Sequence, residues 1–334
     1  MKRFLGLMAG VALGLGVVTS AQAADFKPAV VYDMGGKFDK SFNEGVWNGV
    51  KRFTEETGVE VMEFEVTNEA QRAQAMQRMV QRGATILLGV GFAQADAINE
   101  VAEANPDKQF SIIDVFWLDQ PNLRQYAFQE HEGSYLVGVA AATKSETGTV
   151  GFVGGMDIPL IRKFACGYVQ GAKSVGADIE VLQNMTGSTP SAWNDPVKGG
   201  ELTQSQIDRG ADVVYHAAGG TGMGVIRAAA DAGKLAIGVD SNQNHVVPGS
   251  VLTSMLKRVD VAAYQTFMDA YNGSFDTGVK VLGIAEGGID WAVDEHNAAL
   301  IEGSVKDAVE AAKAGILSGE IKVHNYEDDS SCPL

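Results

Sequence analysis

From residue 25 onward, short apolar runs alternate with longer amphipathic stretches. The runs are rich in Val, Ile and Leu and predict buried strands, and the stretches between them predict helices. Predicted strands lie at 29–32, 59–65, 85–90, 110–115, 149–153, 179–183, 213–216, 236–239 and 251–255, and predicted helices at 42–57, 68–82, 93–104, 132–144, 160–174, 196–209, 222–232, 258–272 and 297–317. This pattern indicates an α/β protein with parallel sheets that are covered by helices on both faces.

The alternation pauses near 126–130 and resumes with the predicted strand at 149–153, so two comparable βα sets follow one another. We predict two doubly wound lobes that are joined by three short crossings near 128–131, 254–257 and 282–286. The N-terminal lobe then comprises residues 24–128 and about 256–283, and the C-terminal lobe residues 129–255 and about 284–334. Two such lobes on short hinges form a clamshell that closes on a ligand.

The segment from Val30 to Glu44 predicts a strand, a glycine-containing loop and a helix, in that order. Its end, Ser41-x-x-Glu44, matches a capping box. Open α/β sheets bind their ligands at such junctions. The loop carries two acids and two phenylalanines, which suit a heteroaromatic ligand with hydroxyl groups and would repel a phosphate.

Other helix signals are local. Asn68 is a candidate cap for the helix at 68–82, which Gly83 would end. Asp195 before Pro196 supplies an N-cap followed by proline at the first helical position.

The first 23 residues have the three parts of a secretory signal peptide. Lys2 and Arg3 are followed by an apolar run and by Ala21-Gln22-Ala23, a small-residue cleavage site, with no cysteine there to carry a lipid. A buried N-terminal helix is the alternative. We expect a soluble protein that is exported to the periplasm, with no direct insertion into the membrane.

The net charge and the length of the chain after the signal peptide limit the classes of function that are possible. The formal charge is −16, and it becomes −18 without Lys2 and Arg3. An acidic surface argues against binding to nucleic acid. The roughly 310 residues that follow Ala23 are too many for one typical core and agree with two domains.

Only two cysteines are present, Cys166 and Cys332. An oxidising compartment permits a disulfide between them, but Cys166 lies among apolar helix residues, where a buried free thiol is also common. Neither cysteine nor the five histidines has the spacing of a zinc site, and we expect no metal and no cofactor.

Enzyme motifs are missing. The run from Gly220 to Val225 follows a predicted strand, but Val225 stands where a dinucleotide-binding fingerprint needs its third glycine. The chain contains no P-loop, no G-x-S-x-G elbow and no H-E-x-x-H motif. We therefore expect a binding protein, with no catalytic residues.

Polar and aromatic residues gather instead at the carboxyl ends of the predicted parallel strands and at the helix starts that face them. The candidate ligand-binding residues are Asp33, Phe42, Asn43, Asp114, Phe164, Trp193, Gly219, Gly220, Asp240 and Lys257. The glycines would present backbone N–H groups at a helix start.

Several of these candidates have a structural alternative. Asp114 and Asp240 could instead cap the helices that follow their strands. Lys257 could be a solvated lysine, and Trp193 could cover the edge of a lobe. Phe42 and Phe164 could belong to the core.

The chain resembles the basic membrane protein family of ABC-transporter substrate-binding proteins, the group that contains the PnrA-type purine-nucleoside receptors. The resemblance spans nearly the whole exported part and is carried by six blocks: Asp33-Met-Gly with Asp39-Lys-Ser-Phe-Asn-Glu44, Glu130-His-Glu-Gly-Ser-Tyr-Leu-Val-Gly138, Gly151-Phe-Val-Gly-Gly155, Asn194-Asp-Pro196, Gly238-Val-Asp-Ser241 and Val251-Leu-Thr-Ser-Met-Leu-Lys257. It implies a two-lobed type I periplasmic-binding-protein fold, each lobe a doubly wound parallel sheet, with the ligand in the cleft.

The resemblance also implies roles. Phe42 would be one of two rings that stack on the ligand base, and Trp193 stands where the family usually has phenylalanine. The aspartates would accept hydrogen bonds from the ribose or the base, and Lys257 would donate to a ligand oxygen. The family's usual lipidated cysteine is missing.

We expect a monomeric periplasmic binding protein that captures a purine nucleoside and delivers it to the membrane permease of an ABC importer. Three alternatives remain open: the same fold binding a free nucleobase or a sugar, a periplasmic nucleoside hydrolase, and the ligand-binding subunit of a sensor. Clusters of acidic residues are compatible with a hydrolase, although the compact D-x-D motif that would hold its calcium ion is absent from the sequence.

Overall fold

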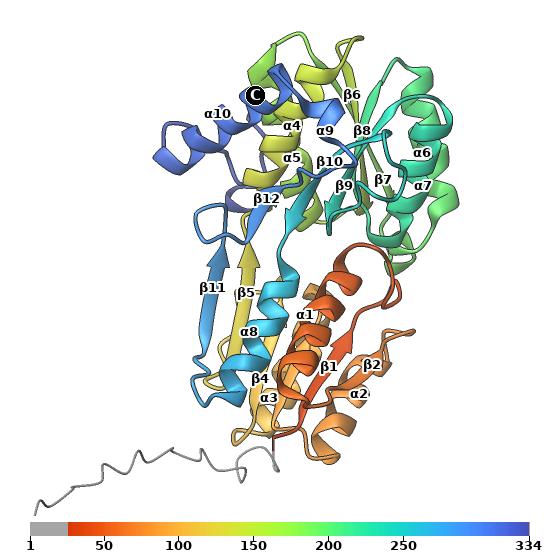
Figure 1. Cartoon of the computed structure of the whole chain (residues 1–334). Coiled ribbons are helices and arrows are strands. Elements are labelled where there is room, and N and C mark those ends of the chain that lie inside the picture. Colours follow the sequence, from red (N-terminus) through yellow and green to blue (C-terminus); the bar gives the residue numbers. More distant parts are fainter. Residues whose placement is uncertain (1–25, 334) are drawn as a thin grey trace, which may run out of the picture.

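The structure is a computed structural model that describes residues 26–333, so the predicted signal peptide lies outside the described residues. Two six-stranded sheets form two lobes, one below the other in Figure 1. Both are sheets of parallel strands, except that the last strand of the second sheet is antiparallel to its neighbour.

The first sheet has the strand order β11-β5-β4-β3-β1-β2. Its strands are β1 (Pro28–Tyr32), β2 (Met62–Glu65), β3 (Ile86–Gly89), β4 (Gln109–Ile113), β5 (Leu123–Phe128) and β11 (Gly278–Leu282). The helices of this lobe are α1 (Phe42–Thr57), α2 (Gln71–Gln81), α3 (Ala95–Ala104) and α8 (Val259–Tyr271).

Both faces of this sheet are buried, which explains its continuous apolar strands. Along β1, Val30 and Tyr32 join the core beneath α1 and α8, whereas Ala29 and Val31 join the core beneath α2 and α3. Because side chains alternate along a strand, a central strand such as β1 is apolar along its whole length and contributes to both cores.

The second sheet has the order β12-β10-β9-β8-β6-β7. Its strands are β6 (Thr149–Met156), β7 (Glu180–Gly187), β8 (Val213–Ala217), β9 (Leu235–Asp240), β10 (Val251–Lys257) and β12 (Ile289–Trp291). The helices are α4 (Glu130–Lys144), α5 (Pro159–Val175), α6 (Pro196–Asp208), α7 (Gly222–Asp231), α9 (Ala298–Ile301) and α10 (Ser304–Ser318).

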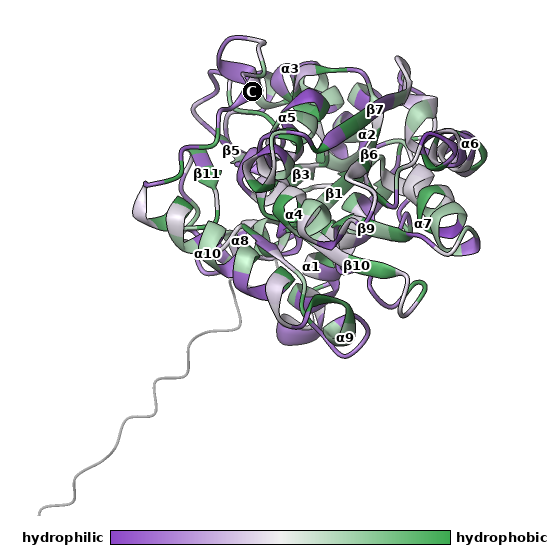
Figure 2. Ribbon diagram, turned by 90° about the horizontal axis from the view of Figure 1, so that it is seen from above, coloured by the Kyte–Doolittle hydropathy of each residue, from purple (hydrophilic) through white to green (hydrophobic). Residues whose placement is uncertain are grey.

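Helix α4 lies in the interior of the second lobe, where Figure 2 shows it surrounded by other elements. It packs most closely on α5, and glycines allow the approach. A Cβ on Gly138 would lie 2.2 Å from the Tyr168 carbonyl oxygen, and one on Gly171 would lie 2.0 Å from the Tyr135 carbonyl oxygen. The two helices therefore form a rigid pair behind the cleft.

The chain passes between the lobes three times, after β5, after β10 and after β11. The apolar pattern did not predict β5, β11 or β12, and the helix expected at 297–317 is divided into α9 and α10. Strand β5 was missed because Arg124 and Gln125 interrupt it, although both are buried. Strand β11 lies at a sheet edge and is partly exposed.

The predicted capping box at the start of α1 is wrong. Ser41 makes no capping hydrogen bond with its side chain. Instead, the Asp39 carboxylate accepts hydrogen bonds from the backbone N–H groups of Ser41, Asn43 and Glu44, at 2.8, 3.0 and 3.1 Å. A carboxylate satisfies several free N–H groups at once, and it also favours the positive end of the helix dipole. The predicted cap at Asp195 is present and accepts from the Lys198 N–H at 2.9 Å.

Cys166 of α5 and Cys332 near the C-terminus form a disulfide, which decides between the two alternatives that the sequence left open. In the described part of the chain, no helix has both the length and the apolar character of a membrane span.

Candidate functional site

A cleft lies between the lobes, at the carboxyl ends of β1, β4, β8, β9 and β10. The space among its side chains, including the part that is open to solvent, is about 610 Å³. It is lined by Asp33, Met34, Asp39, Phe42, Asn43, Gly91, Phe92, Asp114, Leu160, Ile161, Phe164, Trp193, Ala217, Ala218, Gly219, Val239, Asp240 and Lys257.

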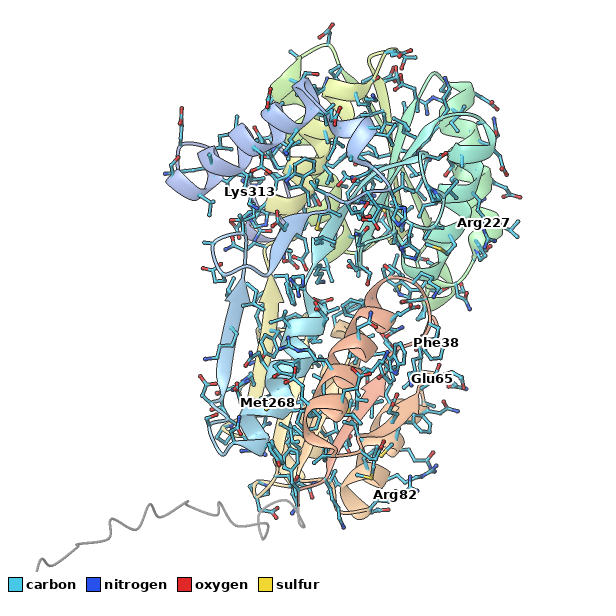
Figure 3. All side chains as sticks on the ribbon, in the orientation of Figure 1. Phe38, Glu65, Arg82, Arg227, Met268 and Lys313 are labelled. Atoms are coloured by element: carbon cyan, nitrogen blue, oxygen red, sulfur yellow. A yellow bond between two sulfur atoms is a disulfide. The ribbon has the colours of Figure 1, made fainter. Side chains whose placement is uncertain are left out.

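The candidates predicted from sequence come together here with one exception. Gly220 follows Gly219 in a short 3-10 helix (Gly219–Thr221) but does not line the cleft. The two phenylalanines of the segment from Val30 to Glu44 lie in different places. Phe42 lines the cleft, whereas Phe38, labelled in Figure 3, is exposed and packs edge-on against Trp47 at 5.1 Å between ring centroids.

Asp114 and Asp240 end their strands in the left-handed backbone region, with φ of 66° and 62°. Residues other than glycine adopt this region rarely, and such strain concentrates at functional sites. Neither residue caps a helix: Asp114 pairs with Lys257, and Asp240 accepts a hydrogen bond from Ser41. The strained turns aim both carboxylates at the space between the lobes.

Lys257 is buried, and two carboxylates balance its positive charge. Its Nζ lies 2.7 Å from Asp114 Oδ1 and 2.9 Å from Glu130 Oε1. Burial alone would lower the pKa of Lys257, but the two carboxylates outweigh burial and raise that pKa above its usual range. The side chain is therefore a fixed cation and not a solvated surface lysine.

Aromatic rings surround this cation. Lys257 Nζ lies 5.1 Å from the centroid of Phe42, 5.2 Å from that of Phe128 and 5.6 Å from that of Phe164. These distances are in the range of cation–π attraction. Phe42 and Phe164 thus hold Lys257 in place as well as lining the cleft.

Trp193 lies at the end of a short 3-10 helix (Pro190–Trp193) of the second lobe, opposite Phe42 of the first. Its ring rests on Gly155, where a Cβ would approach the ring to 2.1 Å. Gly155 therefore leaves the space that the indole occupies. Trp193 is only partly buried, which leaves part of it free for a ligand.

The first lobe adds one carboxylate and one amide. Asp33 forms an ion pair with Arg72 at 3.1 Å, and burial raises the pKa of Asp33 although Arg72 opposes this. Asn43 donates from Nδ2 to the carbonyl oxygens of Gly36 and Asp33, at 3.2 and 3.4 Å. Its Oδ1 is buried and accepts no hydrogen bond from residues 26–333. A buried acceptor without a donor is costly, so a ligand that donates here would remove the cost.

The two lobes touch at the rim of the cleft. Ser41 Oγ donates to Asp240 Oδ2 at 2.5 Å, and Ser241 Oγ donates to the Ser41 carbonyl oxygen at 2.9 Å. Gln243 Nε2 donates to the Lys40 carbonyl oxygen at 2.9 Å. The lobes are therefore closed on each other.

Gln243 also connects the rim to the interior of the second lobe. Its Oε1 accepts from the Val239 N–H at 2.9 Å and lies 2.9 Å from His216 Nε2. Burial lowers the pKa of His216 to about 4, so this histidine is neutral near pH 7 and donates through Nε2.

Sequence reasoning predicted no role in the cleft for Ser41, Glu130 and Gln243, and it considered Asp39 only as one of the two acids of the opening loop. It also did not select the lining residues Met34, Gly91, Phe92, Leu160, Ile161, Ala217, Ala218 and Val239. Glu130 offered one signal, because it stands at the first crossing between the lobes, where the chain enters α4. The roles of Ser41 and Gln243 depend on contacts between segments about 200 residues apart, which no local pattern reveals.

Among residues 26–333, no cluster of three or more His, Cys, Asp or Glu side chains is placed to hold a metal ion.

Comparison with known proteins gives a consistent result. The family model of the PnrA-like ABC transporter substrate-binding proteins matches residues 26–327. The nucleoside-binding protein BmpA of an ABC transporter in Lactococcus lactis is 33% identical over 321 residues, covering 90% of this chain and 89% of that protein. A CD4+ T-cell-stimulating antigen of Listeria monocytogenes is 32% identical, covering 90% and 88%. An uncharacterised lipoprotein of Pyrococcus abyssi is 33% identical, covering 84% and 73%.

Solved structures are similar over most of their length. The crystal structure of a solute-binding protein of an ABC transporter system from Aeropyrum pernix superposes with a TM-score of 0.82 at 29% identity, covering 91% of this chain and 95% of that one. A LacI transcriptional regulator from a Rhodococcus species superposes with a TM-score of 0.59 at 13% identity, covering 77% and 94%. The second likeness concerns the fold alone.

Proposed function

Because the chain belongs to the PnrA-like family of ABC-transporter substrate-binding proteins, and is thus a solute-binding protein and not an enzyme, we propose that its cleft binds a purine nucleoside for import. One observation carries the proposal: aromatic rings from opposite lobes, Phe42 and Trp193, line a buried cleft that also presents carboxylates. Flat apolar walls suit a nucleobase, and carboxylates suit the hydroxyl groups of a ribose. The nucleoside-binding relative in Lactococcus lactis supports the same ligand class.

Binding would be non-covalent and coupled to closure. Phe42, Asn43, Asp33 and Asp114 belong to the first lobe, whereas the ring of Trp193 belongs to the second. A ligand that contacts both lobes binds the closed form more tightly than the open form and so shifts the protein towards closure. The bound, closed protein would then deliver the nucleoside to the membrane permease of an ABC importer.

We infer that the protein acts outside the cytoplasm, as an exported periplasmic protein. The signal-peptide pattern of residues 1–23 supports this. The disulfide supports it as well, because disulfides persist in oxidising compartments.

We expect Asp240 to recognise the sugar. Ser41 occupies its Oδ2, and no residue between 26 and 333 donates to Oδ1, which leaves that oxygen for a ribose hydroxyl. A 2′,3′-dideoxynucleoside should therefore bind at least about tenfold more weakly than the ribonucleoside, a loss of about 1.4 kcal/mol. Isothermal titration calorimetry with adenosine, guanosine and their dideoxy analogues measures the difference.

The matched variant is Asp240→Asn, which should shrink the ratio between ribonucleoside and dideoxynucleoside affinities. Equal affinities for both compounds in the wild type would reject this role of Asp240. Titration with the free base then separates the nucleoside from the base as ligand, because the base leaves Asp240 without a ligand hydroxyl.

A Trp193→Ala variant should bind adenosine or guanosine about 1–3 kcal/mol more weakly, which is the range of one base-stacking contact. Its stability without ligand should change little, because the indole is partly exposed and lies on a glycine. Calorimetric titration and thermal unfolding of the same preparations measure both quantities. A stability loss of about 3–5 kcal/mol would instead mark Trp193 as a core residue.

A further inference from the structure

The cation of the cleft is one member of a row of buried charges that leads away from the cleft. We call it the ion row: Asp114, Lys257, Glu130, Lys163 and Glu327. Beyond the two contacts of Lys257 already described, Glu130 Oε2 lies 2.7 Å from Lys163 Nζ, and Lys163 Nζ lies 2.7 Å from Glu327 Oε2. Lys257, Glu130 and Lys163 have side-chain exposures of 2%, 1% and 6%, so the middle of the row is closed to solvent.

The row connects five separate parts of the chain, the first of which is Asp114 after β4. Lys257 ends β10 at one crossing between the lobes, and Glu130 begins α4 at another. Lys163 lies in α5, next to Phe164 of the cleft wall. Glu327 comes from a short 3-10 helix (Tyr326–Asp328) in the C-terminal tail, which we define as residues 322–333.

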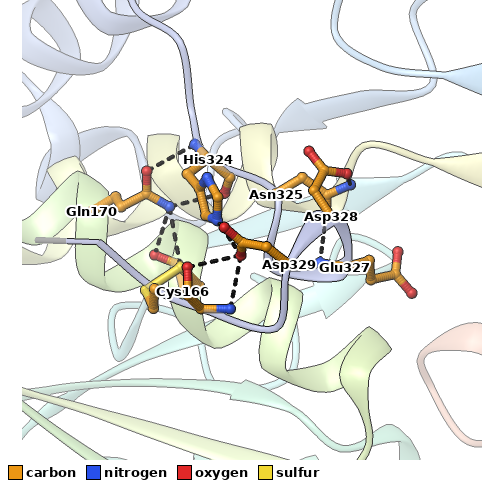
Figure 4. A network of polar contacts seen from close by, with 9 residues as sticks. Cys166, Gln170, His324, Asn325, Glu327, Asp328 and Asp329 are labelled. Carbon is orange, nitrogen blue, oxygen red and sulfur yellow. Dashed lines mark hydrogen bonds and ion pairs between the residues drawn. A yellow bond between two sulfur atoms is a disulfide. The ribbon is translucent and has the colours of Figure 1, made fainter.

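Figure 4 shows the contacts that attach the tail to α5. The disulfide joins Cys332 to Cys166 of α5. One turn further along α5, the Gln170 side chain exchanges two hydrogen bonds with the His324 backbone, at 3.0 and 2.8 Å. The Asn325 side chain accepts from the Glu327 N–H at 3.1 Å and so shapes the 3-10 turn. Glu327 is thereby held between two attachments to the same helix.

Alternating charges make the row interdependent. Each of the three middle ions, Lys257, Glu130 and Lys163, lies between two opposite charges, and it depends on both because water does not reach it and salt screens it weakly. Without Glu327, Lys163 would have Glu130 as its one remaining carboxylate partner in the row and would compete more strongly with Lys257 for it. The Lys257 ammonium, which already lies 2.7 Å from Asp114 Oδ1, would then turn away from Glu130 about that contact and shift at the wall of the cleft.

We propose that Glu327 is a positioning residue for the ligand cleft, which sets the place of the Lys257 ammonium through Lys163 and Glu130. The C-terminal tail then belongs to the binding machinery although it touches no ligand. The proposal rests on the proposed function, since its main readout is the affinity for a nucleoside.

The experiment compares Glu327→Gln with Asp328→Asn. Asp328 is the neighbouring carboxylate of the same turn, but it is exposed and bonds only Asn325 in its side-chain contacts, at 3.1 Å. We expect Glu327→Gln to weaken the binding of adenosine and guanosine about 2–30-fold, the range of energetic coupling through a contact network. Asp328→Asn should leave the affinity unchanged.

A double-mutant cycle separates positioning from a general loosening of the tail. In a Lys163→Met background, Glu327 has no ammonium to hold, so adding Glu327→Gln should weaken binding no further. An equal loss in both backgrounds, or an equal loss in Asp328→Asn, would overturn the proposal.

A readout without ligand keeps the two proposals distinguishable. In protein with ¹⁵N-labelled lysine, the side-chain ammonium signal of Lys257 should shift in Glu327→Gln and stay in place in Asp328→Asn. If the wild type binds neither nucleoside, the proposed function fails while this shift still supports the role of Glu327. An unchanged Lys257 signal in Glu327→Gln would overturn that role whatever ligand the cleft binds.

Discussion

A Lys257→Met variant should lose about 3–5 kcal/mol of unfolding free energy, the usual cost of removing one partner from a buried ion pair. The reason is the environment of Asp114 and Glu130, whose buried carboxylates both lie within 3 Å of Lys257 Nζ, at 2.7 and 2.9 Å. Methionine keeps the length of the side chain but leaves the carboxylates without this cation. Urea denaturation at pH 8 measures the loss.

The loss should shrink as the pH falls. Without the cation, burial and the nearby Glu130 carboxylate raise the pKa of Asp114 further, whereas Glu130 keeps its ion pair with Lys163 at 2.7 Å. Asp114 in the folded variant then takes up a proton more readily than in the unfolded chain, so the variant gains stability relative to the wild type on acidification. Repeating the denaturation at pH 5 tests the sign. Lys51→Met is the matched control, because Lys51 is exposed and its partner Glu55 lies 3.6 Å away on the helix surface. A loss in Lys257→Met that stays constant between pH 8 and pH 5 would contradict the argument.

Replacing both cysteines by serine should cost about 2–5 kcal/mol, because the disulfide between Cys166 and Cys332 closes a loop with a sequence separation of 166 residues. Long loops lose the most freedom in the unfolded chain when they are closed. The measurement compares urea denaturation of the wild type, the reduced wild type and the double variant. Reductant should destabilise the wild type and leave the double variant unchanged. Equal stability of all three would show that the tail is held by its hydrogen bonds alone.

The central strands could be predicted because strands such as β1 and β3 are buried on both faces and are apolar along their whole length. Strand β5 could not be predicted in this way, because it contains buried polar residues. Arg124 is buried in it, but the arginine is paired with Asp269 at 2.8 Å and with Asp276. Both partners come from a part of the chain about 150 residues away. When the charge of a buried residue is paired with residues so far away along the chain, the local sequence resembles that of a loop.

The same limit applies to the cleft. Asp33, Asp114 and Asp240 could be found because each follows an apolar strand, and parallel strands end at one edge of a sheet. Ser41 was misread as a helix cap because its actual partner, Asp240, lies in the other lobe. Glu130 was missed because a glutamate in the first turn of a helix is ordinary there, and only burial beside two lysines makes it unusual.

The three crossings between the lobes have a consequence for the order of assembly. α8 and β11 complete the first lobe, yet they follow β10 of the second lobe in the chain. Strand β5 therefore finds its neighbour β11 only after most of the second sheet has been made, and Cys332 arrives last of all. Pairings between such distant segments are slow to form. Neither lobe is complete until the chain has crossed between the lobes for the third time, so we expect the two lobes to finish folding together.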